Sequence, residues 1–481
     1  MNQKKSIGIN FIMNTVVQGS AYILPFVVTP YVSRILLPEG MGRISYATSI
    51  ITYFIMFALL GVPTYGVREC AKVSSNIESL SQTVKQILII NLIMGILVYF
   101  ALGIFIKLPV ELSVDKSLLL LMSPAIFLNI INIDWLYKGI ERFSEIAVRN
   151  VIVRLLFIIL IFVFVKKQED YKIYGVFTML ASYGVGIWNF WGSRKYVDYK
   201  VKCNVRKIKE HLIPITVFFG MTVATTIYTN LDTVMLGIIR GNSETGIYDS
   251  AIKIKSILVS AVSALGIVLL PRVTQYINDN NIDKFKEICR HALNIVVVMS
   301  LSFVFFSELN AKNIILTFSG NKFEDSIPVL RYIVPTVFLI GVTNITGIQM
   351  LVPLGKERWV FFSEIMGAVV DFFFNMVFIP VLGAKGAALG TVIAELVVTI
   401  IQIYACRKYV MELVVKLQYS KIFITILVAS VVNILINLLD LSCFCQLVIS
   451  AVFFYTTMFI ILLVLKEQET MYLLKKIMRR R

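Results

Sequence analysis

The sequence contains few charged residues and very few histidines and cysteines. Only 16% of its 481 residues are Asp, Glu, Lys or Arg, whereas soluble domains usually contain ~25%. Two histidines leave little basis for His-based catalysis, and six cysteines in so long a chain do not form a disulfide framework. Only Cys443 and Cys445 lie close together, without the His or acidic cluster that a metal site requires. We therefore predict no metal site, no cofactor and no catalytic residues.

The sequence also lacks long polar segments and the phosphate-binding loop of ATPases. No segment between its apolar stretches is long enough for a soluble catalytic domain. The nearest match to a Walker motif, Gly355-Lys356, has Glu357 where Ser or Thr is needed, and Met350 replaces the first glycine. Energy for transport would therefore come from an ion gradient, the membrane potential or the substrate gradient.

Apolar residues make up 58% of the sequence, and the mean hydropathy is +0.81. A helix that spans a membrane needs ~20 mostly apolar residues, and the sequence supplies about fourteen such stretches. We predict an all-α polytopic membrane protein with about fourteen transmembrane helices. The first stretch is too long for the core of a signal peptide. The stretches are 7–33, 44–65, 84–106, 117–137, 146–165, 173–191, 213–239, 247–270, 292–309, 327–354, 359–380, 384–404, 422–439 and 443–465.

The net charge of +17 comes from 46 Lys and Arg against 29 Asp and Glu. In a soluble protein this excess would suggest nucleic acid, but in a membrane protein it indicates topology. With both termini in the cytoplasm, about 29 Lys and Arg fall on the cytoplasmic side and about 11 on the outer side. We predict a multi-pass protein of the bacterial cytoplasmic (inner) membrane, with both termini cytoplasmic. Its basic face would meet anionic lipids, and we expect no nucleic acid partner.

A weak internal repeat relates the two halves of the sequence. The segment Gly139-Ile140-Glu141-Arg142 reappears as Gly355-Lys356-Glu357-Arg358. Transporters built from parallel repeats place their substrate site between the halves. We predict two parallel six-helix bundles, 1–193 and 212–409, joined by a basic cytoplasmic linker, 194–211, and followed by two additional helices and a basic tail, 410–481. Other matched positions are Gly42 with Gly246, Ala47 with Ala251, Ile50 with Ile254, and Pro124 with Pro335.

Several ionisable residues fall inside the apolar stretches. Such a group costs at least ~2.5–3.5 kcal/mol at the centre of a membrane helix, so it usually faces a cavity or a partner. Arg154 and Asp371 lie far from either end of their stretches. Asp232 lies in a polar run, 225–233, that would be costly against lipid. These three residues are therefore stronger candidates than ionisable residues near helix ends, which can extend to the membrane surface.

Two further groups of cations have competing explanations. Lys253 and Lys255 lie about 200° apart around a helix, so they cannot both face one lumen. We favour Lys253 because its repeat counterpart, Ser49, is also polar. Arg68 and Arg142 lie at predicted cytoplasmic helix ends, where contact with lipid phosphate or with the helix dipole would also explain them.

Five segments carry a resemblance to a known family. They are 10–34 followed by Leu37-Pro38-Glu39-Gly40-Met41-Gly42, then 60–69 (LGVPTYGVRE), 139–143 (GIERF), 230–237 (NLDTVMLG) and 380–388 (PVLGAKGAA). In their order and spacing, the sequence resembles the Wzx-type polysaccharide flippases, which share a superfamily with multidrug and toxin extrusion transporters and lipid II flippases. The resemblance implies fourteen helices in two bundles around a central cavity. It also implies a substrate made of a sugar repeat unit on undecaprenyl diphosphate, and a polysaccharide polymerase complex as a partner.

The chemistry of such a substrate suggests roles for particular residues. A diphosphate needs cations in a shielded lumen, and arginine binds phosphate through paired hydrogen bonds. For phosphate contact or gating we predict Arg34, Arg68, Arg149, Arg154 and Lys253. For the sugar we predict Asn14, Gln18, Tyr228 and Asn230. For charge balance or binding of a coupling ion, H⁺ or Na⁺, we predict Asp232, Asp371 and Glu395. The halves would alternate in opening the cavity to each side.

Two other functions remain open. A drug or cation antiporter of the same superfamily would need an acidic lumen, which Asp232, Asp371 and Glu395 could supply, but Arg149 and Arg154 argue against it. A membrane-embedded polysaccharide polymerase or ligase would need a sizeable external loop with catalytic groups. The longest predicted loop is instead cytoplasmic and basic. We therefore expect a flippase and not an enzyme.

Overall fold

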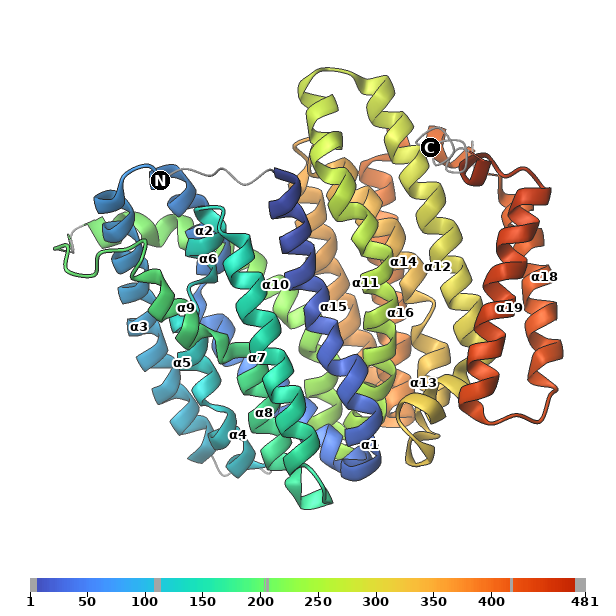
Figure 1. The fold of residues 1–481 in the computed structure, drawn as a ribbon, viewed down its shortest axis with the longest axis horizontal. Helices are drawn as coiled ribbons and strands as arrows, with labels where there is room; N and C mark the ends of the chain where they lie inside the picture. The colour runs from blue at the N-terminus through green and yellow to red at the C-terminus, as the bar shows by residue number, and fades with distance from the viewer. Residues whose placement is uncertain (1–6, 108–113, 203, 205–206, 416–417, 472–481) are drawn as a thin grey trace. The chain divides into compact units, whose positions relative to one another are not determined.

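The computed structural model describes residues 7–107, 114–202, 204, 207–415 and 418–471, and the chain divides into two compact units. The N-terminal unit is Met1–Gly246 and the C-terminal unit is Ile247–Arg481. All regular structure in the described residues is helical, with no strand among them (Figure 1). Counted across short breaks, eleven stretches of the described helices are long and apolar enough to cross a membrane. The prediction of an all-α, multi-pass membrane protein is therefore confirmed.

The N-terminal unit contains one very long helix and several short ones. Its helices are α1 Ile7–Leu59, α2 Val62–Val73, α3 Ile77–Lys107, α4 Lys116–Met122, α5 Pro124–Ile131, α6 Asp134–Gly139, α7 Phe143–Phe164, η1 Gln168–Asp170, α8 Tyr171–Tyr183, α9 Val185–Ser193 and α10 Ile208–Ile239. The next helix, α11 Asn242–Asn278, begins in this unit and continues into the C-terminal unit.

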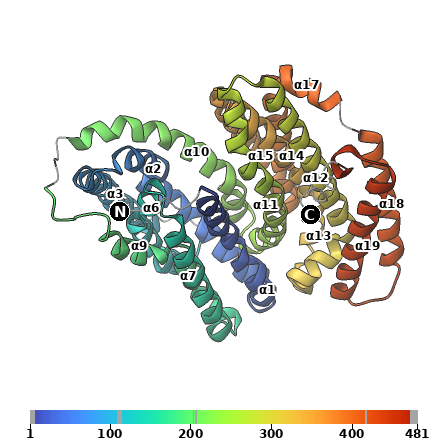
Figure 2. The same ribbon diagram turned by 45° about the horizontal axis from the view of Figure 1, so that its top comes forward.

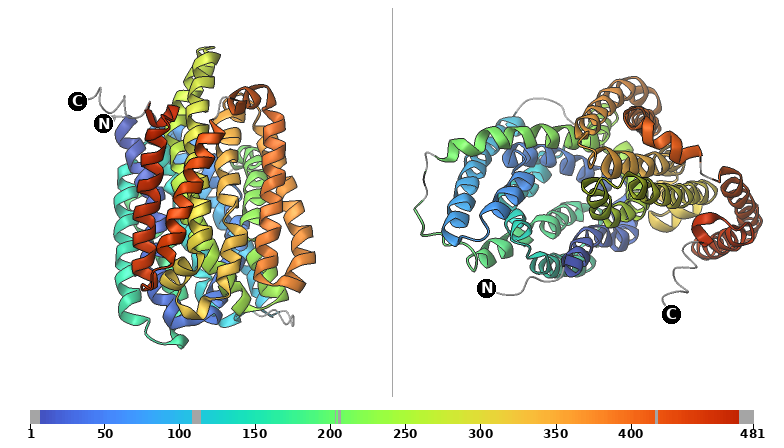
Figure 3. Two further views of the ribbon diagram at one scale, coloured as in Figure 1. Left: turned by 90° about the vertical axis from the view of Figure 1, so that its right-hand side faces the viewer. Right: turned by 90° about the horizontal axis from the view of Figure 1, so that it is seen from above.

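The C-terminal unit contains a π-helix among its α-helices. Its remaining helices are α12 Ile282–Phe318, η3 Asn321–Phe323, α13 Ser326–Ile333, α14 Thr336–Thr343, the π-helix η4 Asn344–Leu351, α15 Glu357–Leu382, α16 Ala384–Ala405, α17 Arg407–Val415, α18 Tyr419–Asn437 and α19 Cys443–Val464. The last two are the predicted stretches 422–439 and 443–465, and they contact α12 (Figure 3).

Prolines and glycines break several predicted spans. The first two predicted stretches share α1, which is interrupted at Leu37 (φ 60°, ψ 176°) because the residue before a proline is disfavoured in helical conformation. The stretch 117–137 is divided at Pro124 and the stretch 327–354 at Pro335. The stretch 173–191 is divided at Gly184 into α8 and α9. These divisions interrupt the predicted spans, but each of the fourteen predicted stretches still lies mainly in helix.

The breaks agree locally with the predicted repeat. Leu37 and Gly241, which lie 204 positions apart, both have positive φ angles, 60° and 86°. The turns before α7 and α15 also have one residue each with positive φ, Glu141 and Gly355. The parallel layout of two bundles itself stays a prediction.

The predicted bundle boundaries differ from the division by packing. α10 contacts α1, α2 and α3 and therefore belongs to the N-terminal unit (Figure 2), whereas the predicted boundary after residue 211 assigns it to the second bundle. The core of the N-terminal unit includes the fully buried Val62, Val84, Leu136 and Ile146. In the C-terminal unit, Phe454 of α19 is fully buried in a core that also contains Val296 of α12.

The first turn of α11 packs against α1 just after the break at Leu37, and the two backbones are in direct contact. A Cβ atom on Gly42 would lie 1.7 Å from the carbonyl oxygen of Asn242, and one on Gly246 would lie 1.9 Å from that of Pro38. Both contacts therefore require glycine. The predicted repeat relates the two contacts to each other. Gly246 lies 204 positions after Gly42, and Asn242 lies 204 positions after Pro38.

Candidate functional site

Five polar residues form a connected cluster where α6, α7 and α9 meet. We call Asn132, Asp134, Glu145, Arg149 and Asn189 the α6–α7–α9 cluster. Arg149 Nη2 lies 2.9 Å from Glu145 Oε2, one helical turn earlier on α7, and its Nη1 donates to Asn189 Oδ1 at 3.0 Å. Asn189 Nδ2 in turn donates to Asn132 Oδ1 at 2.9 Å and to Asp134 Oδ1 at 2.6 Å. The cluster therefore links three helices through polar side chains.

Backbone and aromatic groups complete the surroundings of Arg149. Its guanidinium carbon lies 4.9 Å from the centre of the Tyr137 ring, and Tyr137 Oη donates to the carbonyl of Asn189 at 2.7 Å. A Cβ atom on Gly192 would lie 2.6 Å from Arg149 Nη2, so this glycine makes room for the guanidinium. The Arg149 side chain is 12% exposed. Arg149 therefore holds α7 against α9, with its charge balanced by Glu145.

Arg154 lies on the same helix as Arg149, and its charge interacts with Asp134. Both arginines predicted on α7 are thus brought near one half-buried carboxylate, although the sequence separates them from Asp134 by a helix boundary. The sequence predicted the two cations but not their acidic and amide partners. Asn189, 40 positions from Arg149, gave no signal of its own in the sequence.

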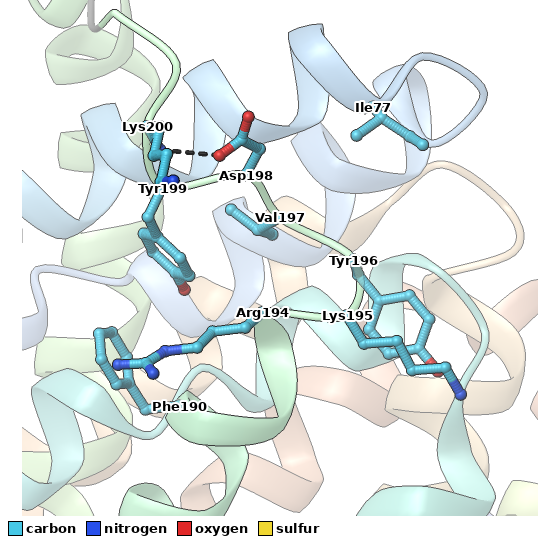
Figure 4. A pocket seen from close by; sticks show the side chains of 9 residues that line it. All are labelled: Ile77, Phe190, Arg194, Lys195, Tyr196, Val197, Asp198, Tyr199 and Lys200. Atoms are coloured by element: carbon cyan, nitrogen blue, oxygen red, sulfur yellow. Dashed lines mark hydrogen bonds between the residues drawn. The ribbon is translucent and has the colours of Figure 1, made fainter.

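The basic segment after α9 adds cations beside the cluster. A pocket of about 680 Å³ is lined by Arg194, Lys195 and Lys200 together with aromatic and apolar residues (Figure 4). In this view the side chain of Arg194 lies near Phe190, and that of Lys195 lies near Tyr196, on the other side of the pocket. These cations belong to the linker predicted from the sequence.

Tyr196 connects this segment to the cluster. Its hydroxyl donates to Glu145, and Arg142 lies 5.5 Å from the centre of its ring. Burial, followed by the adjacent Glu145 carboxylate, raises the pKa of Tyr196 to about 12. The hydroxyl therefore stays protonated at physiological pH and can donate this bond. Lys85 of α3 fixes the segment further by donating to the carbonyls of Tyr199 and Val201 at 2.9 and 2.5 Å.

Four other predicted residues on the first two helices are not brought into the cluster. Arg34 is exposed and donates to the carbonyl of Pro30, one turn earlier on α1. Arg68 is exposed, with its Nε 4.0 Å from Glu69 Oε1. Asn14 and Gln18 lie within α1, but their side chains are outside the part of the chain that the structure describes.

The predicted residues of α10 and α11 have mainly local partners. Asn230 Nδ2 donates to the carbonyl of Thr226 at 3.1 Å, Asp232 is buried, and Tyr228 is half-buried. Lys253 forms an ion pair with Asp249, one turn earlier, at 2.6 Å. The four-residue spacing of Asp249 and Lys253 was visible in the sequence and could have predicted this pair.

A second polar region lies between α15 and α16 in the C-terminal unit. We call Asp371, Asn375, Glu395 and Gln402 the α15–α16 seam, and all four are at least 94% buried. A Cβ atom on Gly390 would lie 2.5 Å from Asn375 Oδ1 and 3.4 Å from Asp371 Oδ1. The two helices therefore approach closely at a glycine, and polar side chains fill the contact.

Hydrogen bonds extend the seam to neighbouring elements. Gln402 Nε2 donates to Ser363 Oγ at 3.1 Å, and Thr346 of η4 donates to Gln402 Oε1 at 2.9 Å. The sequence predicted Asp371 and Glu395 separately; Asp371 lies at the helix contact beside Gly390, and Glu395 is buried on α16. The pair Gly386 and Gly390, whose four-residue spacing is typical of closely packed membrane helices, could have predicted the close approach of α15 and α16.

Comparisons with protein families match most of the chain. The family described as "Polysaccharide biosynthesis protein" matches residues 7–277. The family described as "MatE" matches residues 218–377.

Individual relatives are distant but cover much of the chain. A protein of Escherichia coli (strain K12) named "Putative O-antigen transporter" is 24% identical over 372 residues, which is 76% of this chain and 88% of that protein. A protein of the same name from Shigella dysenteriae is 22% identical, over 83% of this chain and 99% of that protein. The "Probable low-salt glycan biosynthesis flippase Agl15" of Haloferax volcanii is 21% identical, over 59% of each chain.

Solved structures show the same fold. The lipid II flippase MurJ, in an inward closed conformation, has a TM-score of 0.73 and 16% identity and covers 95% of this chain and 100% of its own. An inward-facing multidrug resistance transporter of the MATE family has a TM-score of 0.56 and 17% identity, over 86% of this chain and 96% of its own.

Proposed function

The chain belongs to the polysaccharide biosynthesis protein family, and from this we propose that it is a Wzx-type flippase. It moves undecaprenyl-diphosphate-linked oligosaccharide repeat units from the cytoplasmic to the outer leaflet. The observation that carries the proposal is the match of 95% of the chain to the fold of a lipid II flippase, in a family of polysaccharide biosynthesis proteins. The transporter and flippase names of its relatives support the same substrate class.

The α6–α7–α9 cluster supports a role for arginine in handling the diphosphate. A charged group inside a membrane protein is costly unless it serves a partner or a substrate. Arg149 is already paired with Glu145 and bonded to Asn189, so we assign it the positioning of α7. Arg154 is our candidate for contact with the phosphate, because a guanidinium group can bind two phosphate oxygens through paired hydrogen bonds.

Coupling, topology and partners form part of the same proposal. The α15–α16 seam would bind the coupling ion, H⁺ or Na⁺, through Asp371 or Glu395. The protein would lie in the bacterial inner membrane with both termini in the cytoplasm, its basic face toward anionic lipids and a polysaccharide polymerase complex beside it. The two predicted bundles, 1–193 and 212–409, would alternate in exposing the substrate to each side.

A drug or cation antiporter is the second candidate. The MatE match over residues 218–377 contains Asp371 and favours this alternative for the C-terminal part of the chain. The higher TM-score with the lipid II flippase, together with Arg149 and Arg154, favours the flippase.

Arg154 provides a direct test of the flippase proposal. We expect R154A and R154E to abolish transport of purified lipid-linked oligosaccharide in liposomes and to abolish surface polysaccharide in cells, with the protein still in the membrane. R240A, which removes an exposed arginine at the end of α10, is the matched control and should transport normally. Full export by R154E would overturn the role of Arg154, and transport of a cationic drug instead of the lipid-linked sugar would overturn the flippase itself.

A further inference from the structure

An apolar groove of about 580 Å³ runs along the surface of the N-terminal unit between α7 and α8–α9. On α7 it is lined by Val153, Leu156 and Phe157, at the spacing of one helix face. On α9 it is lined by Ile187 and Trp188, which are 54% and 44% exposed. An open apolar groove on a membrane-spanning surface faces hydrocarbon, so its natural occupant is an acyl chain.

The groove has the length of one leaflet. It extends from Leu180 to Gly192, and twelve residues of helix rise about 18 Å. One leaflet contributes roughly half of the ~30 Å hydrocarbon core. A single acyl chain of a phospholipid fits this length, whereas a polyprenyl chain of many isoprene units would extend well beyond it.

Cations lie at the Trp191 end of the groove. Trp191, 68% exposed, lines this end, and the guanidinium carbon of Arg194 lies 5.1 Å from the centre of its ring. Lys195 follows directly and is also exposed. Tryptophan and arginine side by side are typical of the level of lipid headgroups. Arg149, which lies behind Gly192, is paired with Glu145 and adds little net charge.

We propose that this groove is a binding site for an anionic phospholipid. One acyl chain lies between α7 and α8–α9, and the headgroup phosphate contacts Arg194, while Lys195 adds positive charge nearby. The proposal does not depend on transport of lipid-linked sugars. Its consequence is that one phospholipid class binds the N-terminal unit beside the α6–α7–α9 cluster and stabilises the packing of α7 on α9.

Tryptophan fluorescence can test the site, because two of the chain's four tryptophans line the groove. The protein is reconstituted as W359F in phosphatidylcholine vesicles that contain a small fraction of brominated phosphatidylglycerol or brominated phosphatidylcholine. Bromine on an acyl chain in the groove quenches Trp188 and Trp191, whereas Trp135 is 3% exposed and away from lipid. We expect brominated phosphatidylglycerol to quench at a much lower mole fraction than brominated phosphatidylcholine.

Two pairs of variants separate the headgroup from the acyl chain. R194Q/K195Q should weaken phosphatidylglycerol binding by about 30-fold, which is about 2 kcal/mol for two surface cations. V153F/L156F fills the groove and should remove the strong quenching, while I152F/L155F, shifted by one residue on the same helix, should not.

Three results would overturn the proposal. The first is equal quenching by the two brominated lipids in the unsubstituted groove, and the second is an unchanged lipid preference in R194Q/K195Q. The third is displacement of phosphatidylglycerol by polyprenyl phosphate at a lower concentration, which would make the groove a site for the substrate's tail. Because R194Q/K195Q changes only exposed side chains, its result does not depend on the folding of the groove-filling variant.

Discussion

The α6–α7–α9 cluster and the α15–α16 seam solve the same problem, polar groups inside a membrane protein, in different ways. The cluster contains a full ion pair, Arg149 with Glu145, and distributes hydrogen bonds over three helices. The seam contains carboxylates and amides between two helices that meet at Gly390. The cluster is connected by long side chains, whereas the seam depends on close backbone approach.

This difference teaches which chemistry each region can support. A region with arginine can receive an anion without a change of fold, because an anion can replace the carboxylate at the guanidinium. A region with buried carboxylates and no arginine suits a proton or a small cation. The two regions therefore differ in the sign of the charge that each could bind.

The largest expected effect comes from removing one half of the ion pair in the cluster. R149M leaves Glu145, whose side chain is 27% exposed, without its cation and Asn189 without its donor, and the two losses together should cost about 3 kcal/mol of the free energy of unfolding. We expect the double variant E145M/R149M to recover much of the loss. SDS-induced unfolding in mixed micelles measures both values. The control is K72M, which removes the exposed partner of Glu69 and should cost at most about 0.5 kcal/mol. An R149M protein as stable as the control would contradict the structural role of the pair.

The second effect distinguishes size from polarity in the seam. D371L places an apolar side chain among buried amides and should lower the free energy of unfolding by about 2 to 3 kcal/mol, because neighbouring polar groups lose their partner. D371N keeps the shape and should cost less than 1 kcal/mol. If the seam couples an ion to transport, D371N should also make transport independent of H⁺ and Na⁺ gradients in liposomes. If D371L and D371N lowered the free energy of unfolding equally, the stability of the seam would not depend on its polar groups.

The third effect compares the two regions by adding one methyl group to each. G390A brings a Cβ atom against a short, fully buried Asn375 and should cost roughly 2 kcal/mol. G192A meets the flexible end of Arg149 and should cost roughly 1 kcal/mol. G103A, on α3, is the control, because a Cβ atom there meets nothing within 4 Å and should stabilise the helix. A larger loss of stability for G192A than for G390A would contradict the difference between the long Arg149 side chain and the short Asn375 side chain.

The smallest effect lies outside both regions and depends on pH. Burial alone would raise the pKa of Asp115, but hydrogen bonds from Ser117, Tyr171 and Leu118 and the charge of Lys172 lower it to about 2. Its stabilising contribution is therefore complete above the unfolded pKa of about 4 and is lost as the pH falls toward 2. After solvent screening we expect at most about 1 kcal/mol. The difference in melting temperature between the unsubstituted protein and D115N should therefore shrink between pH 6 and pH 3, and a constant difference would contradict the assignment.

The sequence supported the prediction of spans better than that of contacts. Hydropathy located the helices, and Pro124 and Pro335 mark two of their breaks, because these are local properties of the chain. Glu145 lies four positions before Arg149 and could have been predicted as its partner, whereas Asn189 and Asp134 reach the two arginines only through the packing of α6, α7 and α9. α10 packs within the N-terminal unit, whereas the predicted boundary after residue 211 assigns it to the second bundle. No change of composition in the linker indicates this packing.

The contact of Gly42 with Asn242 and of Gly246 with Pro38 has a consequence for the history of the sequence. In each contact a side chain would collide with a carbonyl oxygen of the main chain, which no rotamer change can move aside. If the two halves descend from a duplicated gene, every descendant must keep glycine in both copies, however far the remaining residues diverge. Both glycines would then be conserved in all descendants. An alignment of distant relatives on Gly42 and Gly246 would therefore fix the register of both halves together.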